Sequence, residues 1–307
     1  MSDPLALPAG VQVFERGWLS ANNILLCDAH EAVLVDSGYV THSAQTLALL
    51  TGALGSRPLD RLLNTHLHSD HCGGNAALQA HYPALQTWIP PGLSEAVRHW
   101  QREAMSHDAT GQSCPPFRFD QLLRPGQTLR LGPLDWEVHA APGHDPDSVL
   151  LFAPAARLMI SADALWEHGF GVVFPELLQE PAFDAVASTL DLIERLAPQV
   201  IIPGHGRVFA DTAGALQRAR SKLERFVQAP DRHAAHGAKV LLVFKLLEWQ
   251  QVPQAQMRQW ATSVPYLRQL HARLGGGQPL DDWLQSLLAE LQHSGALVQD
   301  ADWVRAA

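Results

Sequence analysis

Four side chains that commonly bind metal ions stand close together in the first third of the chain. His66, His68, Asp70 and His71 occur in the segment THLHSDH, directly after an aliphatic run that predicts a strand. The loop beyond a strand end can turn such side chains toward one point. Imidazole nitrogens and a carboxylate oxygen form a ligand set that suits zinc, iron or manganese. This segment therefore predicts a metal site.

Three further residues of the same kinds follow other predicted strands. They are His144 in the sequence PGH, Asp163 in SAD and His205 in PGHG. Each stands just beyond a short apolar run typical of a strand, as the first group does. Four predicted strand ends thus carry seven side chains of metal-ligand type.

The HxHxDH segment and the three later motifs, in this order, resemble the signature of the metallo-β-lactamase superfamily. The resemblance covers roughly residues 11–211. It implies an α/β fold, an αββα sandwich, in which ligands from four strand ends converge. It also implies two metal ions, with His66, His68 and His144 holding the first, Asp70, His71 and His205 holding the second, and Asp163 bridging them.

The implied cofactors are two divalent metal ions, with zinc expected and iron or manganese as alternatives. Two such ions about 3.5 to 4 Å apart can share a water, lower its pKa and present a bridging hydroxide to a carbonyl carbon. Asp70 would bind a metal and orient the hydroxide, and His168 is a candidate proton donor to the leaving group. The resemblance therefore implies a hydrolase of an ester, thioester, lactone or related small carbonyl substrate.

The aromatic loop after Asp163 narrows the substrate only a little. Trp166, Phe170 and Phe174 either line an apolar pocket or pack the loop onto the sheet. Acyl-homoserine lactonases carry a tyrosine where this chain has Trp166, which weakens that specificity. No basic and tyrosine cluster near the C-terminus matches the glutathione site of glyoxalase II enzymes. The small-molecule substrate is therefore left unnamed.

Two other activities stay open. The C-terminal tail resembles the winged-helix appendage of lactamase-β-like endoribonucleases, which would make the chain an RNA phosphodiesterase. The net charge of −9 counts against a nucleic-acid partner, because such binding depends on neutralising phosphates. The other activity is that of a mononuclear iron oxidoreductase resembling the persulfide dioxygenases. A content of one iron per chain would distinguish it.

The remaining histidines and the three cysteines are expected to be structural. Cys27, Cys72 and Cys114 show no CxxC spacing, which argues against a disulfide framework and against a thiolate zinc site. Cys72 is expected to pack beside the metal site, and Asp36 to close a turn. The histidines expected to be ordinary surface or core residues are His30, His42, His81, His99, His107, His139, His233, His236, His271 and His293.

Strands and helices alternate along the region that carries the motifs, which is typical of a layered α/β architecture. Strands are expected at 11–14, 23–27, 32–36, 59–64, 86–89, 128–131, 136–140, 149–152, 157–161 and 199–202. Helices are expected at 43–54, 73–81, 93–105 and 182–196, and a long surface loop at 107–124.

From residue 213 onward the pattern is mainly helical and ends in a predicted hairpin. We therefore expect a catalytic domain at 1–225 and a smaller, helical, winged-helix-like domain at 226–307. The tail helices are expected to wall the substrate pocket or to form a homodimer contact. The chain has no apolar run of the roughly 20 residues that a membrane span needs and no secretory signal pattern, so a cytoplasmic protein without a membrane partner is expected.

Overall fold

Short aliphatic strands from the first part of the chain build a six-stranded sheet in the order β1-β2-β3-β4-β5-β6. The structure is a computed structural model that describes residues 5–307. Strands β3 to β6 are parallel neighbours, so their carboxyl ends lie along one edge of the sheet. The strands are β1 (Val11–Phe14), β2 (Asn23–Cys27), β3 (Ala32–Val35), β4 (Arg61–Leu63), β5 (Gln86–Ile89) and β6 (Gln121–Leu122).

A second sheet has five strands in the order β11-β10-β9-β8-β7. Because β9 is antiparallel to both β8 and β10, and β10 is parallel to β11, the strands β8, β10 and β11 run in one direction. The loops that leave their carboxyl ends carry the last three ligand motifs. The strands are β7 (Thr128–Leu131), β8 (Leu134–Ala140), β9 (Val149–Ala153), β10 (Leu158–Ala162) and β11 (Val200–Pro203).

The two sheets pack face to face over a shared apolar core. Leu26 and Val35 of the first sheet belong to the same buried cluster as Trp136, Leu151 and Ile160 of the second. Every residue of β9 and β10 is buried, which requires cover on the outer face as well. This double burial explains why these strands are continuous apolar runs rather than alternating ones.

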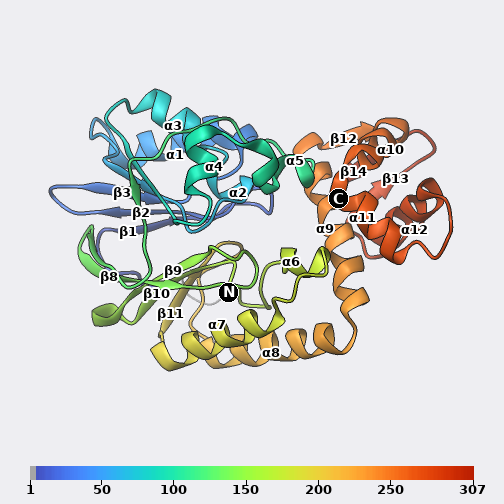
Figure 1. Ribbon diagram of the computed structural model, residues 1–307. Coiled ribbons are helices and arrows are strands. Elements are labelled where there is room, and N and C mark those ends of the chain that lie inside the picture. Colours follow the sequence, from blue (N-terminus) through green and yellow to red (C-terminus); the bar gives the residue numbers. More distant parts are fainter. Residues whose placement is uncertain (1–4) are drawn as a thin grey trace.

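Helices cover both outer faces (Figure 1). Helices α1 (Ser43–Leu54) and α3 (Asn75–His81) pack on the first sheet through a cluster that includes Leu34 and Leu50. Helices α7 (Phe183–Leu196) and α8 (Thr212–Gln228) cover the second sheet. The layer order is therefore α/β/β/α, and the predicted fold class is confirmed.

Two expectations for the segment 93–124 were wrong. The helix expected at 93–105 is the shorter α4 (Ser94–His99). The next residue, Trp100, adopts a left-handed φ of 47°, which ends the helix. The expected loop contains the short helix α5 (Ser106–Ala109) and the edge strand β6. Both are too short to show a helix or strand period in the sequence.

The C-terminal region combines four helices with a small sheet of order β12-β14-β13. The predicted terminal hairpin is β13 and β14, and the sequence analysis missed the short strand β12. Figure 1 shows these elements to one side of the sandwich, joined to it by α9. The elements are α9 (Pro230–Trp249), β12 (Gln251–Pro253), α10 (Gln254–Ser263), α11 (Pro265–Leu274), α12 (Leu280–His293), β13 (Leu297–Gln299) and β14 (Trp303–Ala306).

The core of this region also includes residues from the sandwich. Val172 and Leu177 belong to the same buried cluster as Leu241, Leu267 and Leu288. The expected domain division at 225/226 falls in the last turn of α8, and the division itself stays a prediction. Within residues 5–307, no helix combines the length and the apolar character that a membrane crossing needs.

Candidate metal centre

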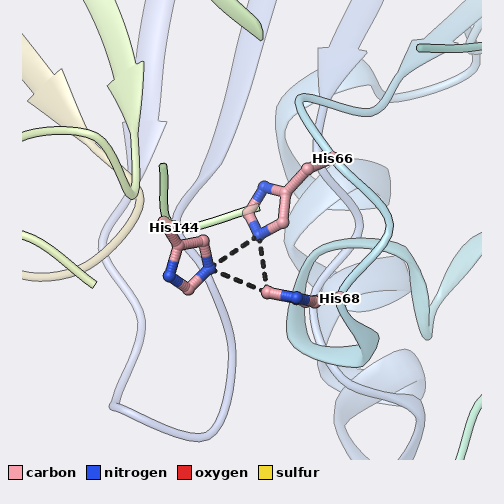
Figure 2. Close-up of side chains that lie close together, drawn as sticks. All are labelled: His66, His68 and His144. Carbon is pink, nitrogen blue, oxygen red and sulfur yellow. Dashed lines mark hydrogen bonds between the residues drawn. The ribbon is translucent and has the colours of Figure 1, made fainter. Parts of the chain in front are cut away.

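Three histidines converge at the ends of β4 and β8. The Nε2 atom of His66 lies 3.1 Å from Nδ1 of His68, which lies 2.7 Å from Nε2 of His144. The third side of this triangle, from His144 Nε2 to His66 Nε2, is 3.2 Å (Figure 2). All three side chains are buried. Three imidazole nitrogens that face one another at these distances are arranged as ligands of one cation.

Burial keeps these imidazoles neutral. Desolvation, followed by the neighbouring histidines, lowers the pKa of His66 well below its usual range. Burial also lowers the pKa values of His68 and His144 to about 4. Neutral imidazole is the form that binds metal ions.

The outward-facing nitrogens of two of these rings are engaged by neighbours, which fixes the tautomer. Nδ1–H of His144 donates to the carbonyl oxygen of Val172 at 2.6 Å. Thr65 Oγ1 lies 3.2 Å from Nδ1 of His66, and the hydroxyl proton of Thr65 goes to Asp36. The Thr65 oxygen therefore accepts from Nδ1–H of His66. Both rings turn an unprotonated Nε2 toward the shared centre, as metal-binding histidines do.

A second group of ligand atoms lies beside the first. Asp70, His71, Asp163 and His205 offer atoms that all lie within 4.8 Å of one another. Oδ2 of Asp70 is 3.0 Å from Nε2 of His205 and 3.9 Å from Nε2 of His71. Burial would raise the pKa of Asp70, but His71 and His205 lower it below the ordinary value, so Asp70 is a carboxylate.

Asp163 lies between the two groups. Its Oδ1 atom is 3.4 Å from Nε2 of His71, and its Oδ2 atom is 3.4 Å from Nε2 of His144. The backbone of Gly204 packs directly against the Asp163 carboxylate. A larger residue at position 204 would clash, because its Cβ atom would lie only 2.1 Å from Asp163 Oδ1. Burial opposes ionisation, but His71, His205 and His144 hold the pKa of Asp163 well below its usual range. The position suits the predicted bridge.

Asp36 has a larger part in the site than the turn role expected from the sequence. It follows β3, adopts a left-handed φ of 59°, and is almost fully buried. Its Oδ2 atom accepts from Nδ1–H of His71 at 2.8 Å, and its Oδ1 atom accepts from the backbone N–H of Thr65 at 2.9 Å. The sequence signal for this role was an acidic residue at the end of an apolar strand, and its position beside β4 emerged only from the fold.

Two observations indicate that this set of ligands fits divalent cations. Nε2 of His71 is buried and makes no hydrogen bond within residues 5–307, although it faces Asp163. Burial disfavours charge on His71, but Asp163, Asp36 and Asp70 raise its pKa well above the ordinary value. Two buried carboxylates and the half-buried Asp70 therefore require positive charge at this point, and a metal ion can supply it in place of the proton.

A cavity of about 370 Å³ opens over both groups. Its lining includes the aromatic side chains of Trp18, Trp166 and Phe174, together with Phe244 from α9. Trp166 donates its Nε1–H to Oδ1 of Asp163 at 3.2 Å, and Trp18 stacks on His205 with ring centroids 5.4 Å apart. Trp166, Phe170 and Phe174, the possible pocket residues named from the sequence, all line the cavity, whereas Trp18 was not predicted.

His168 lies on the same cavity but apart from the buried ligands. Its side chain is 78% exposed, and its Nε2 atom is 3.8 Å from the carboxylate of Glu167. Its role as a proton donor stays a prediction.

Comparisons with known proteins show the family to which the chain belongs. The sequence profile of the metallo-beta-lactamase superfamily matches residues 16–205. A hydroxyacylglutathione hydrolase of Xanthomonas campestris pv. campestris is 30% identical over 242 residues, which cover 75% of this chain and 76% of that protein. The mitochondrial persulfide dioxygenase of Bos taurus is 31% identical over 144 residues, which cover 47% of each chain.

A solved structure shows the same fold over almost the whole chain. A β-lactamase domain protein from Burkholderia ambifaria superposes with a TM-score of 0.59 at 19% sequence identity. The superposition covers 99% of this chain and 95% of that chain. With the profile match and the two groups of ligand atoms, the conclusion is that this chain belongs to the metallo-β-lactamase superfamily.

Proposed function

We propose that this chain is a hydrolase that cleaves an ester, thioester or lactone of a small molecule at a centre of two divalent ions, with zinc expected. The position of Asp163 carries the proposal. Its Oδ1 atom lies 3.4 Å from His71 of one ligand group, and its Oδ2 atom lies 3.4 Å from His144 of the other group and 3.8 Å from His205. A ligand that bridges two ions must reach both groups. A single ion would leave one group of buried ligands without a cation.

Bound divalent ions would supply an activated water and polarise the carbonyl oxygen of the substrate. The chain's own side chains would orient the reactants. Asp70 is ionised and lines the cavity, so its carboxylate is available to hold the attacking water by a hydrogen bond. His168 lines the same cavity and is exposed enough to exchange protons with solvent, which suits protonation of the leaving group.

The wall of the cavity favours a substrate with an apolar body. Trp18 and Trp166 flank the ligand His205, and Phe174 lies against His68 with ring centroids 4.7 Å apart. On the other side, α9 contributes Val240, Leu241 and Phe244. Such a wall would bury an acyl group and exclude bulk water from the reaction.

Lys222 adds a cation to this lining. Its Nζ donates to the carbonyl oxygen of Phe170 at 2.8 Å and lies 4.8 Å from the Phe170 ring centroid. Burial lowers the pKa of Lys222 to about 8, so the amine is still mainly charged at neutral pH. We therefore expect the preferred substrate to combine an apolar acyl group with an anionic group elsewhere.

The test combines metal analysis with a substrate panel. Elemental analysis of freshly purified protein should give at least two divalent ions per chain. The same sample should hydrolyse a member of a panel of esters, thioesters and lactones, and a chelator should abolish the activity. The hydroxyacylglutathione hydrolase relative supports testing acyl-glutathione thioesters first. Hydrolysis that survives complete removal of metal would refute the proposal.

A second candidate is an iron-dependent persulfide dioxygenase, which the similarity to the Bos taurus enzyme favours. It predicts one iron per chain and oxygen consumption with a persulfide. The same elemental analysis, followed by an oxygen-electrode assay with glutathione persulfide, separates the two activities. Two ions and no oxygen uptake would exclude the dioxygenase.

A further inference from the structure

Outside the metal centre, the fold brings together three more side chains that could bind a metal ion. Cys72 lies on α2 (Ser69–Cys72), His107 on α5, and Cys114 on the loop that follows. Their ligand atoms all lie within 4.8 Å of one another. Cys72 and His107 are buried and Cys114 is half-buried. The absence of CxxC spacing argued against a thiolate zinc site, because the cysteines are far apart along the chain and only the fold brings them together.

The spacing of the two sulfur atoms matches a tetrahedral metal site. The Sγ atoms of Cys72 and Cys114 are 3.7 Å apart. Two thiolates bound to one zinc ion at about 2.3 Å, with tetrahedral angles, lie ~3.8 Å from each other. A cation placed between them would therefore need almost no change in the sulfur positions.

One ring nitrogen of His107 is available to bind a metal ion. Its Nε2 atom lies 2.8 Å from the carbonyl oxygen of Leu67, which can only accept, so Nε2 carries the proton. The Nδ1 atom is left unprotonated in the neutral ring, and no hydrogen bond within residues 5–307 engages it. Histidines that bind metal ions commonly donate their other N–H to a backbone carbonyl in this way.

A separate cavity gives this cluster access to solvent. It has a volume of about 340 Å³ and is lined by His107 and Cys114, among others. A metal ion could enter from this side, and a water could complete the coordination. Three protein ligands with one open position are common for zinc.

We propose that Cys72, His107 and Cys114 form a third metal site for a thiophilic divalent cation such as Zn²⁺. Binding replaces the two thiol protons, which pass to solvent, and no electron is transferred. The site would brace the ligand loop of the main centre. Leu67 stands between His66 and His68, and its carbonyl oxygen accepts from His107 and lies 3.5 Å from Cys72 Sγ.

Cobalt(II) substitution tests this proposal. Thiolates bound to Co²⁺ give an intense charge-transfer absorption in the near ultraviolet, and no cysteine belongs to the two groups of ligands at the main centre. Protein purified anaerobically, stripped of metal and titrated with Co²⁺ should show this band. The band should persist in Cys27→Ser and in Asp163→Ala, and disappear in Cys114→Ser. Elemental analysis should give one Zn²⁺ fewer per chain in Cys114→Ser.

The readout does not depend on turnover, so the proposal and the proposed hydrolase function can fail separately. A band in a protein without hydrolytic activity would leave the third site standing. Absence of the band in folded wild-type protein whose three cysteines are all reduced, or equal zinc contents in wild type and Cys114→Ser, would overturn it. If Cys114→Ser does not fold, His107→Gln serves as the second variant, and its zinc content must fall in the same way.

Discussion

The Nδ1–H group of His71 donates to the carboxylate of Asp36 at 2.8 Å, and this contact fixes which nitrogen of His71 faces the metal centre. The same carboxylate accepts from the hydroxyl of Thr65, which in turn accepts from His66. Asp36 thereby orients one histidine in each ligand group. It is a positioning residue, because it reaches the centre only through these side chains.

Asp36→Asn should weaken metal binding about 10- to 100-fold, the usual effect of removing such a partner. Asparagine keeps the size of the side chain and tolerates the left-handed φ of 59°. However, its amide group places a donor opposite either Thr65 or His71, both of which need an acceptor. Competition with a chromophoric chelator measures the change in affinity, and hydrolytic rates at saturating metal should partly recover.

Asp28→Asn is the matched control. Asp28 also accepts backbone hydrogen bonds in a turn, from the N–H groups of His30 and Glu31, but lies outside the site. If Asp36 only closed a turn, the two variants would have the same metal affinity. Equal affinities would therefore contradict the positioning role.

Asp163→Ala should remove at least one metal ion and reduce kcat/KM by two orders of magnitude or more. The change leaves His71 and His144 without the carboxylate that faces both of them. Loss of an ion would remove charge that activates the water and polarises the carbonyl. Removal of a single charge-stabilising group from an active site already lowers rates about 10²- to 10³-fold. Elemental analysis and initial rates check the prediction, with the exposed Asp135→Ala as control. Unchanged metal content would exclude Asp163 as a ligand.

The ligand motifs could be found from the sequence because each stands directly after a strand whose apolar run is visible. The parallel order of β3 and β4 then places Asp36 beside the HxHxDH segment, and that neighbour relation is absent from the linear sequence. Asp36 therefore looked like a turn residue. Its function depends on which strands pair, and pairing is set by the whole sheet.

The contribution of Trp18 was invisible for the same reason, whereas the contribution of Phe244 was one of two alternatives that the sequence left open. Trp18 lies in an N-terminal loop and stacks on His205, far away in the sequence. Phe244 belongs to a tail helix whose apolar spacing predicted packing, either as a wall of the substrate pocket or as a dimer contact. The structure places it both against Tyr39, with ring centroids 5.2 Å apart, and on the cavity. Periodicity predicts a buried face, whereas the partner depends on tertiary structure.

Val240→Phe should restrict the substrates that the cavity accepts. Val240 is half-buried on α9 and lines the cavity, so a larger side chain fills space that an acyl group would occupy. We expect kcat/KM to fall at least tenfold for bulky acyl esters, while acetyl esters change less than twofold. Val227→Phe, at an exposed position of α8, should leave both unchanged. Equal losses for large and small substrates would show a general structural defect instead.

His233 should make the folded state weaken as the pH falls below about 6.5. Its ring is buried, and Nε2 accepts a hydrogen bond from the backbone N–H of Val173 at 3.1 Å. Burial, with His236, Lys222 and Arg273 nearby, lowers the pKa of His233 to about 3. An unfolded histidine titrates near 6.5, so between these values the unfolded chain binds the proton and the folded chain does not. The stabilisation is therefore complete above pH 6.5 and declines by about 1.4 kcal/mol per pH unit below it.

His233→Gln isolates this effect, because the amide oxygen of glutamine can still accept from Val173 but does not titrate. Urea unfolding at several pH values between 7 and 4.5 should give a shallower fall in unfolding free energy for the variant than for the wild type. His30→Gln, in an exposed turn, should follow the wild-type curve, and any loss of metal at low pH acts on all three proteins alike. Parallel curves for wild type and His233→Gln would mean that His233 takes up its proton equally in the folded and unfolded chain. In that case the contact with Val173 would not hold the ring neutral.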